Sequence, residues 1–271
     1  MYKRLAILFL FVIFLGGCTS KISTKSSQPP IRQLVNELAM DKRPFVGIFP
    51  HSSGKLLTLL VDRIGSEFKS VTIDMEYLSG NSLKGGRIGI NLPVNLPYAQ
   101  GFLLGSCSTG GKCSFDTNLI NGTIKTKLGV DLSTIHVLKS DYLFVNGPVN
   151  STDGKLSWKP TKLKQTNQII SDSQGLPKAF DQELSYAPIM ITSTSPEKIS
   201  GELTIKATTS KVKVYDGAAY QDQKVTSVDG MTVIKLDTLP WSKSVQITRD
   251  DQKGASESLT IYAVGPFLLL K

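Results

Sequence analysis

The sequence predicts an all-β fold of two β-sandwich domains in tandem, preceded by a signal peptide, a tether and a short helix. Three observations support this fold class. Apolar and polar residues alternate along short segments, Asn-Gly and Asp-Gly pairs separate such segments, and 40% of the 271 residues are hydrophobic. In the clearest segment, residues 70–77, one face of the expected strand carries Val71, Ile73, Met75 and Tyr77. Glycine-rich turns are expected after it.

Residues 1–17 have the layout of a secretory signal peptide. Lys3 and Arg4 precede an unbroken apolar run at 5–15. At about 1.5 Å per residue, this run is too short to cross a hydrocarbon core of about 30 Å comfortably as a permanent helix. We therefore leave residues 1–17 out of the fold and expect the rest of the chain to be exported.

The end of this signal, Leu15-Gly16-Gly17-Cys18, resembles the lipobox of bacterial lipoproteins. The resemblance implies cleavage before Cys18, a diacylglycerol on its sulfur and an acyl chain such as palmitate on its new amine. Several acyl chains, at about 0.8 kcal/mol per buried CH₂, form a stable membrane anchor. The alternatives are an ordinary secretory signal and an uncleaved membrane anchor. Because Thr19 and not an aspartate follows, the resemblance implies the outer membrane of a Gram-negative cell, or otherwise the outer face of the cell membrane.

The other two cysteines, Cys107 and Cys113, enclose the sequence STGGK. A Gly-Gly pair between them predicts a hairpin turn, and the exported location favours a disulfide that closes it. On the chain-entropy model so short a loop gains roughly 2 kcal/mol. A metal or redox pair is the alternative, but the spacing is not CxxC and no histidine lies nearby.

Five segments follow from composition and periodicity. After the signal peptide, residues 18–42 contain the lipidated cysteine, a Ser/Thr/Lys-rich tether ending at Pro29-Pro30, and a short helix predicted from IRQLVNELAMDK. Residues 43–157 are expected to form the first β-sandwich, in which the run at 57–62 fits either a strand or a helix and we favour the strand. A polar connector spans 158–184, and the second sandwich spans 185–271.

The last segment resembles the immunoglobulin-like domains of bacterial surface proteins. The resemblance rests on the order ISGELTIKA, KVKVYDG, TVIKLDTLPW and SVQITRDDQKGASESLTIYAV, with Asp-Gly turns between strands. It carries no catalytic signature. The inward-facing candidates are Val212, Val214, Val233, Leu236, Val245, Ile247, Leu259 and Ile261. Trp241 is expected to pack at a strand entrance, with a ligand platform as the alternative.

Few side chains indicate catalysis. The chain has two histidines, His51 and His136, and no G-x-S-x-G elbow, although His51, a serine and Asp74 could form a triad on paper. GIFPHSSGKL at 47–56 lacks the spacing of a phosphate-binding loop. Four aspartates at expected turns (Asp216, Asp229, Asp250 and Asp251) fit turn chemistry better than calcium ligands. We therefore predict no catalytic, cofactor-binding or metal-binding residues.

The formal net charge is +9, and without Lys3 and Arg4 the mature side chains carry +7. Such a charge favours anionic surfaces, although the lysines are dispersed and a solvated basic surface is the alternative. The leading hypothesis is a non-enzymatic, lipid-anchored envelope protein that binds or spaces a partner, either an envelope protein or an anionic glycan and not a specific nucleic acid. The alternatives are an assembly factor for an envelope secretion, pilus or polysaccharide system and a hydrolase of envelope glycan. The oligomeric state stays open.

Overall fold

The structure is a computed structural model that describes residues 31–161, 167–249 and 254–271. Within these residues the secondary structure is β, apart from one short 3-10 helix, η2 (Met40–Lys42). The prediction of an all-β fold is therefore confirmed. The signal peptide, Cys18 and the tether lie outside the described residues, as do Asp250 and Asp251.

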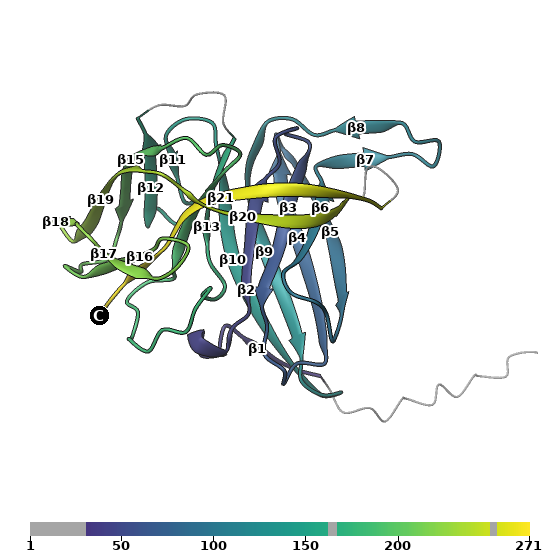
Figure 1. The fold of residues 1–271 in the computed structure, drawn as a ribbon, viewed down its shortest axis with the longest axis horizontal. Helices are drawn as coiled ribbons and strands as arrows, with labels where there is room; N and C mark the ends of the chain where they lie inside the picture. The colour runs from purple at the N-terminus through teal and green to yellow at the C-terminus, as the bar shows by residue number, and fades with distance from the viewer. Residues whose placement is uncertain (1–30, 162–166, 250–253) are drawn as a thin grey trace, which may run out of the picture. The chain divides into compact units, whose positions relative to one another are not determined.

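Most strands belong to one 14-stranded sheet (Figure 1). Its main path runs in the order β2 (Phe45–Pro50), β3 (Leu56–Arg63), β6 (Tyr98–Leu103), β20 (Trp241–Arg249), β21 (Ala255–Leu269), β14 (Ile189–Ser193), β13 (Gln168–Asp172), β10 (Thr134–Val145), β9 (Leu119–Gly129), β4 (Ser70–Ser79) and β5 (Ser82–Asn91). Beside this path, β1 (Arg32–Val35) pairs with β10, and β16 (Val212–Tyr215) pairs with β21 and β17 (Tyr220–Gln223).

The remaining strands form two smaller sheets. The five-stranded sheet has the order β11 (Val149–Asn150), β12 (Leu156–Pro160), β15 (Ile199–Ile205), β19 (Met231–Thr238) and β18 (Thr226–Val228). Strands β7 (Gly105–Cys107) and β8 (Cys113–Phe115) form a separate hairpin.

The first core lies between two parts of the large sheet. Side chains such as Ile48 of β2 and Leu59 of β3 share this core with Ile73 of β4 and Leu138 of β10. The opposite faces of β2 and β3 are covered as well, because Phe49 packs in a second cluster with residues of β14 and β20. Strands buried on both faces read as continuous apolar runs, which explains FVGIFP and LLTLLV. The strand favoured at 57–62 is thereby confirmed.

The second large core lies between the five-stranded sheet and the end of the large sheet. Trp158 of β12, Leu203 of β15 and Ile234 of β19 pack there with Ile191 of β14 and Phe267 of β21. All five side chains are fully buried. This packing is that of two sheets face to face.

Strand β21 takes part in both halves of the fold. Its Ile261 and Ala263 pack with β2 and β3, whereas Val264 and Phe267 pack with the five-stranded sheet. Its partner β20 also pairs in parallel with β6. Residues 31–271 cluster as one compact unit, so the predicted count of two tandem domains is not confirmed.

The predicted connector at 158–184 is wrong in part, because it contains β13. This strand pairs with β10 on one side and β14 on the other, and its first four residues are buried. Its sequence, QIISD, is too short and too polar to show alternation, and its burial comes from neighbours that are distant in sequence.

The predicted short helix within 31–42 is wrong as well. Residues Arg32–Val35 instead form β1, which pairs in parallel with β10. Asn36 ends the strand in a left-handed conformation with φ of 56°, and its side-chain oxygen accepts the Lys139 backbone N–H at 2.9 Å. A single short helical pattern is marginal in water, so the hydrogen bonds offered by β10 outweigh it.

Three smaller expectations also change. The glycines at 85, 86 and 89 lie inside β5 and not in turns, and Asn121-Gly122 lies inside β9. A Cβ at Gly122 would lie 2.3 Å from the Tyr142 ring, so this glycine permits close packing. In β19 the buried residues are Thr232, Ile234 and Leu236, and Val233 is on the other face.

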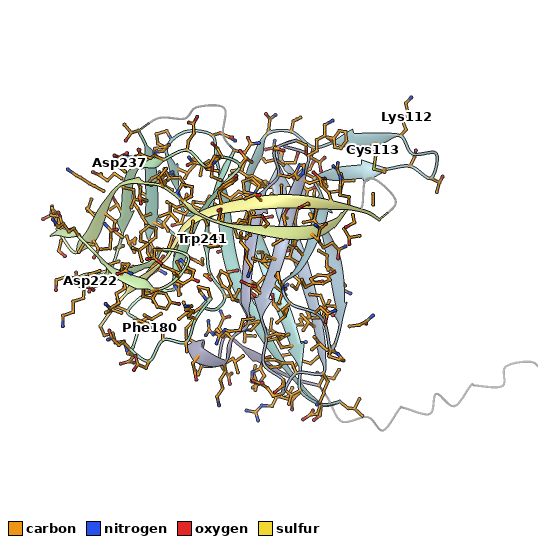
Figure 2. The ribbon with its side chains drawn as sticks, in the orientation of Figure 1. Lys112, Cys113, Phe180, Asp222, Asp237 and Trp241 are labelled. Carbon is orange, nitrogen blue, oxygen red and sulfur yellow. A yellow bond between two sulfur atoms is a disulfide. The ribbon has the colours of Figure 1, made fainter. Side chains whose placement is uncertain are left out.

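Trp241 begins β20 and is half-buried, as expected for a strand entrance (Figure 2). Its indole N–H donates to the Gly265 carbonyl at 2.7 Å. The ring meets Phe49 and Tyr215 edge to face, with centroids 6.2 and 6.0 Å away. Trp241 therefore fills a gap between β2, β16 and β21.

Candidate functional site

A group of cations lies on the outward face of β5, β4, β9 and β10. Strand β4 alternates buried Val71, Ile73 and Met75 with outward polar residues, so Asp74 points away from the core. Across the sheet, Asp74 is opposite Arg87 of β5 on one side and opposite Lys125 of β9 on the other. Lys125 is in turn opposite Lys139 of β10. We call Arg87, Lys125, Lys127 and Lys139 the basic face.

One carboxylate lies among these four cations. Asp74 accepts hydrogen bonds from Arg87 Nε at 2.5 Å and forms an ion pair with Lys127 Nζ at 2.9 Å. Burial alone would raise the pKa of Asp74, but the hydrogen bonds and charges of Arg87 and Lys127 lower it. Four cations and one anion leave a net charge of +3. Like charges directly across a ladder are destabilising, so the Lys125 and Lys139 pair does not serve stability.

The same face becomes acidic further along the strands. Glu76 of β4 and Asp141 of β10 line a cleft of about 470 Å³, together with Asp153 and with Asp172 of β13. Thr123 donates a hydrogen bond to Asp141 at 2.8 Å. This acidic cleft lies between the large sheet and the β11–β12 hairpin, which supplies Asp153.

Asp172 is the most perturbed of these acids. Burial raises its pKa to about 7, and the negative charges of Asp141 and Asp153 act in the same direction. Its carboxylate has no hydrogen bond or ion pair with a described residue. Burial raises the pKa of the neighbouring Tyr186 to about 12, and the negative charge of Asp172 is the next largest cause. At neutral pH the cleft therefore contains a carboxylic acid that can carry its proton.

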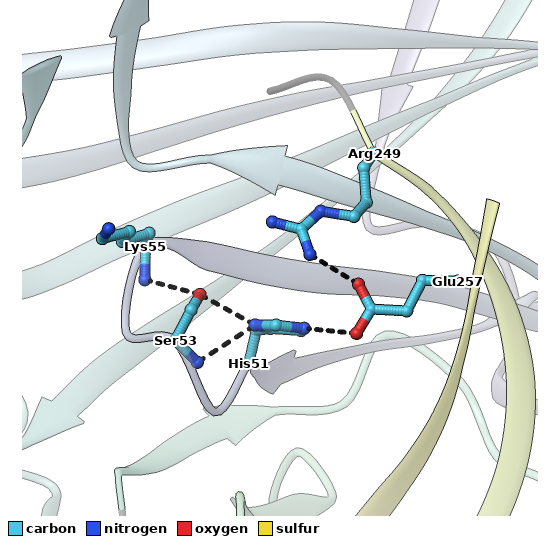
Figure 3. Close-up of polar contacts among 5 residues, drawn as sticks. All are labelled: His51, Ser53, Lys55, Arg249 and Glu257. Carbon is cyan, nitrogen blue, oxygen red and sulfur yellow. Dashed lines mark hydrogen bonds and ion pairs between the residues drawn. The ribbon is translucent and has the colours of Figure 1, made fainter. Parts of the chain in front are cut away.

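His51 is at the centre of a third polar group (Figure 3). His51 directly follows β2, at the start of the β2–β3 turn, and is only 4% exposed. The backbone N–H of Ser53 donates to His51 Nδ1 at 3.1 Å, so Nδ1 is the acceptor and Nε2 carries the proton. Nε2 in turn donates to Glu257 Oε1 at 3.4 Å, and Arg249 donates to Glu257 Oε2 at 2.7 Å.

This network differs from the triad that could be drawn on paper. Ser53 Oγ lies 2.8 Å from His51 Nδ1, but that nitrogen already accepts the Ser53 N–H, and Ser53 Oγ accepts the Lys55 N–H at 3.2 Å. Asp74 pairs with Arg87 and Lys127 instead. The hydrogen bond from Arg249 lowers the pKa of Glu257, and the hydrogen bond from His51 acts in the same direction. The contacts tie the β2–β3 turn to the β20–β21 hairpin.

Cys107 and Cys113 form a disulfide across β7 and β8, with the sulfurs 2.03 Å apart (Figure 2). The two residues are opposite each other in the hairpin register. Lys112 and Cys113 lie at the outer end of this hairpin. At its other end the ring of Phe115 is exposed, and Lys55 Nζ lies 4.4 Å from the centroid of that ring. Lipidation of Cys18 stays a prediction, because that residue is not among the described ones.

Within the described ranges, no three or more His, Cys, Asp or Glu residues are grouped so that they could hold a metal ion. Asp216 instead accepts the N–H groups of Ala218 and Ala219, at 2.8 and 2.7 Å. Asp229, with φ of 49°, forms the hairpin turn between β18 and β19 together with Gly230. Among these same described residues, no helix is long and apolar enough to span a membrane.

Comparisons with known proteins add no family: no protein-family model matches the chain, and a search of curated proteins found no match. The resemblances to bacterial lipoproteins and to immunoglobulin-like domains therefore stay predictions.

Neither the basic face nor Asp172 was among the residues expected from the sequence. The alternation IKTKLG at 124–129 could have indicated cations on one strand face. That Lys139 adjoins this face follows only from the β9–β10 register.

Proposed function

We propose that the protein is a non-enzymatic, lipid-anchored protein of the cell envelope that binds an anionic glycan through the basic face. The lipobox at 15–18 supports the anchor. The observation that carries the binding proposal is the concentration of four cations around Asp74. Such a surface attracts polyanions, and the +7 charge of the mature side chains adds long-range attraction.

The anchor is tested by metabolic labelling with an alkyne analogue of palmitate. Label is expected on the wild-type chain and not on Cys18→Ala. Replacing Cys107 and Cys113 together by serine provides the control, since it removes the two disulfide-bonded cysteines and leaves residues 15–18 unchanged. Label that survives Cys18→Ala contradicts the anchor assignment.

Binding is tested with three soluble polymers: polygalacturonate as anionic glycan, dextran as neutral glycan and polyglutamate as anionic peptide. The full chain in detergent micelles should bind polygalacturonate, and its affinity should fall as salt is raised. Lys125→Glu should weaken binding, whereas Glu76→Gln, which removes a neighbouring negative charge, should strengthen it. Lys235→Glu, on an exposed position of β19, is the matched control.

Three outcomes bear on this proposal. Equal binding of dextran, or equal effects of Lys125→Glu and Lys235→Glu, contradicts a role for the basic face. Preference for polyglutamate favours a protein partner. In that case crosslinking of intact envelopes, followed by capture, would test the alternative of an assembly factor.

The acidic cleft favours a second candidate function, hydrolysis of a glycan. A carboxylic acid with a pKa near 7 can donate a proton to a leaving group, and in the same cleft the hydrogen bonds of Ser151 and Lys155 lower the pKa of Asp153 to about 2. Chain length of polygalacturonate and of envelope glycans after incubation distinguishes the two candidates. Shortening that is lost in Asp172→Asn supports the hydrolase, and unchanged length supports binding alone.

A further inference from the structure

Strand β5 is the last strand on the path of the large sheet, and one of its edges is unpaired (Figure 1). It pairs with β4 along its whole length without a bulge, and with no other described strand. Apart from this ladder, residues 82–91 have no backbone–backbone hydrogen bond with another described residue. A long, regular edge of this kind offers a row of free N–H and C=O groups to a further strand.

The usual devices that protect a strand edge are absent from β5. The strand contains no proline. Its two cations face acids of the same chain, because Arg87 Nε lies 2.5 Å from Asp74 Oδ1 and Lys84 Nζ lies 3.9 Å from Asp116 Oδ1. Neither charge is therefore left unpaired to repel an incoming strand.

One glycine of β5 has no explanation within its own chain. A Cβ at Gly85 would lie 2.6 Å from the Met75 carbonyl oxygen. A Cβ at Gly86 would lie 2.8 Å from the Phe102 ring, so these two glycines permit close packing. A Cβ at Gly89, in contrast, would meet nothing within 4 Å. Glycine inside a strand weakens it and often marks a place where another backbone or a ligand comes close.

A second copy of β5 complements this edge if the two strands pair antiparallel about a two-fold axis at Gly86, perpendicular to the sheet. The outward residues of the two strands are then opposite each other, so Leu83, which is 70% exposed, lies opposite Gly89 of the second copy. The apolar side chain covers the open space at that glycine. Pairing about Arg87 instead would place two arginines directly opposite each other, which is unfavourable.

The same register also matches charges. Within one chain, Arg87 continues the row of Lys125 and Asp74 across the sheet, and Gly85 continues the row of Glu76. In the pair, Arg87 is opposite Gly85 of the second copy, so it extends the row that contains the second copy's Glu76. Gly85 has no side chain to separate the two charges, and Glu76 is exposed and has no ion pair with a described residue.

We propose that two copies of the chain pair through β5, antiparallel and centred on Gly86, so that their large sheets continue into each other. The two basic faces then lie on the same side of one sheet, where a single polyanion can contact both. The proposal goes beyond the function proposed above. It is tested without a glycan, so either proposal can fail alone.

Cysteine cross-linking tests this register in intact cells that produce the full chain. Leu83→Cys combined with Gly89→Cys places each new thiol opposite its counterpart in the second copy, at the Cα separation of about 4–7 Å that a disulfide requires. Oxidation should give a product of twice the mass on a non-reducing gel. Leu83→Cys alone and Gly89→Cys alone are the matched controls and should give none, because like positions of the two copies would be about 20 Å apart.

Three further substitutions are made in the double-cysteine chain. Arg87→Glu should reduce the cross-linked product, because it places a like charge beside the second copy's Glu76. Adding Glu76→Arg to that variant should restore the product. Lys235→Glu, on an exposed position of β19, is the control and should leave the product unchanged. A melting transition followed by circular dichroism verifies that each variant folds.

The proposal is overturned if the double-cysteine chain gives no product although both thiols react with a maleimide, or if either single cysteine gives as much product as the pair. Equal amounts of product from Arg87→Glu and Lys235→Glu would contradict the proposed register. A cross-linked product of any other mass would mean that a different protein covers this edge.

Discussion

Replacing Asp172 by asparagine should stabilise the protein at neutral and higher pH. Asparagine resembles the protonated acid in shape and cannot ionise. The wild-type carboxyl has a pKa of about 7 in the folded protein, against 3.8 for an unperturbed aspartate. Each pH unit between these values is worth about 1.4 kcal/mol, which gives an upper limit of about 4 kcal/mol.

The sign follows from proton binding. Between pH 3.8 and about 7 the folded protein holds the Asp172 proton, whereas the unfolded chain releases it. Raising the pH through this window therefore favours unfolding. The contribution of Asp172 to the free energy of unfolding is highest below pH 3.8, falls up to about pH 7, and is constant above it.

Urea unfolding of the wild type and of Asp172→Asn at pH 5, 6, 7 and 8 measures this effect. The advantage of the variant should increase with pH over this range and then level off. Asp181→Asn, an exposed position, is the control and should show no such trend. A difference between wild type and Asp172→Asn that stays constant from pH 5 to pH 8 would refute the assignment of a raised pKa.

Three further predictions concern stability. Gln168→Leu should raise the free energy of unfolding by about 1–3 kcal/mol, because an unsatisfied buried carbonyl is removed; a decrease would mean that this carbonyl has a partner. Trp158→Ala should lower stability by about 3–5 kcal/mol and leave a single calorimetric transition, because β21 packs both in the core of Trp158 and in the cluster with Phe49 of β2. Two transitions, with only one displaced, would instead support two independent domains. Replacing Cys107 and Cys113 together by serine should lower the free energy of unfolding by about 2 kcal/mol, because the closed loop is short. Reduction of the wild-type disulfide should have the same effect. A clearly larger loss in urea unfolding would contradict this entropic account.

Local patterns predicted those features of the fold that depend on neighbouring residues. The alternation at 70–77 placed Ile73 in the core and Asp74 outside, and this arrangement follows from the two-residue period of a strand. Asp229-Gly230 forms the turn expected of it, because both residues have positive φ. In contrast, Asn121-Gly122 has the same turn chemistry but lies within β9, where Tyr142 packs against Gly122.

The errors have a common physical cause. The apolar residues at 31, 34, 35 and 38 have helical spacing, yet Arg32–Val35 pair with β10, which is about 100 residues away in sequence. The polar residues of β13 indicated a connector, but strands on both sides bury this segment. In both cases hydrogen bonds to distant strands outweigh a weak local preference.

The candidate sites depend on tertiary structure even more strongly. Lys139 and Arg87 lie on strands separated by β4 and β9, so only the register places them on one face. The raised pKa of Asp172 requires burial and the charges of Asp141 and Asp153, neither of which is a neighbour in sequence. The side-chain carbonyl of Gln168 is buried and unpaired among the described residues because β13 lies between β10 and β14.

The all-β class, the hairpin of the cysteine pair and the predicted lipid anchor at Cys18 can all be inferred from the amino-acid sequence. These depend on residues that are neighbours or nearly so, and their chemistry is local. The continuity of the large sheet through β21 and the grouping of cations on the basic face become visible only in three dimensions. Those arrangements depend on pairing between distant strands, and a change of register by one residue would move each side chain to the opposite face.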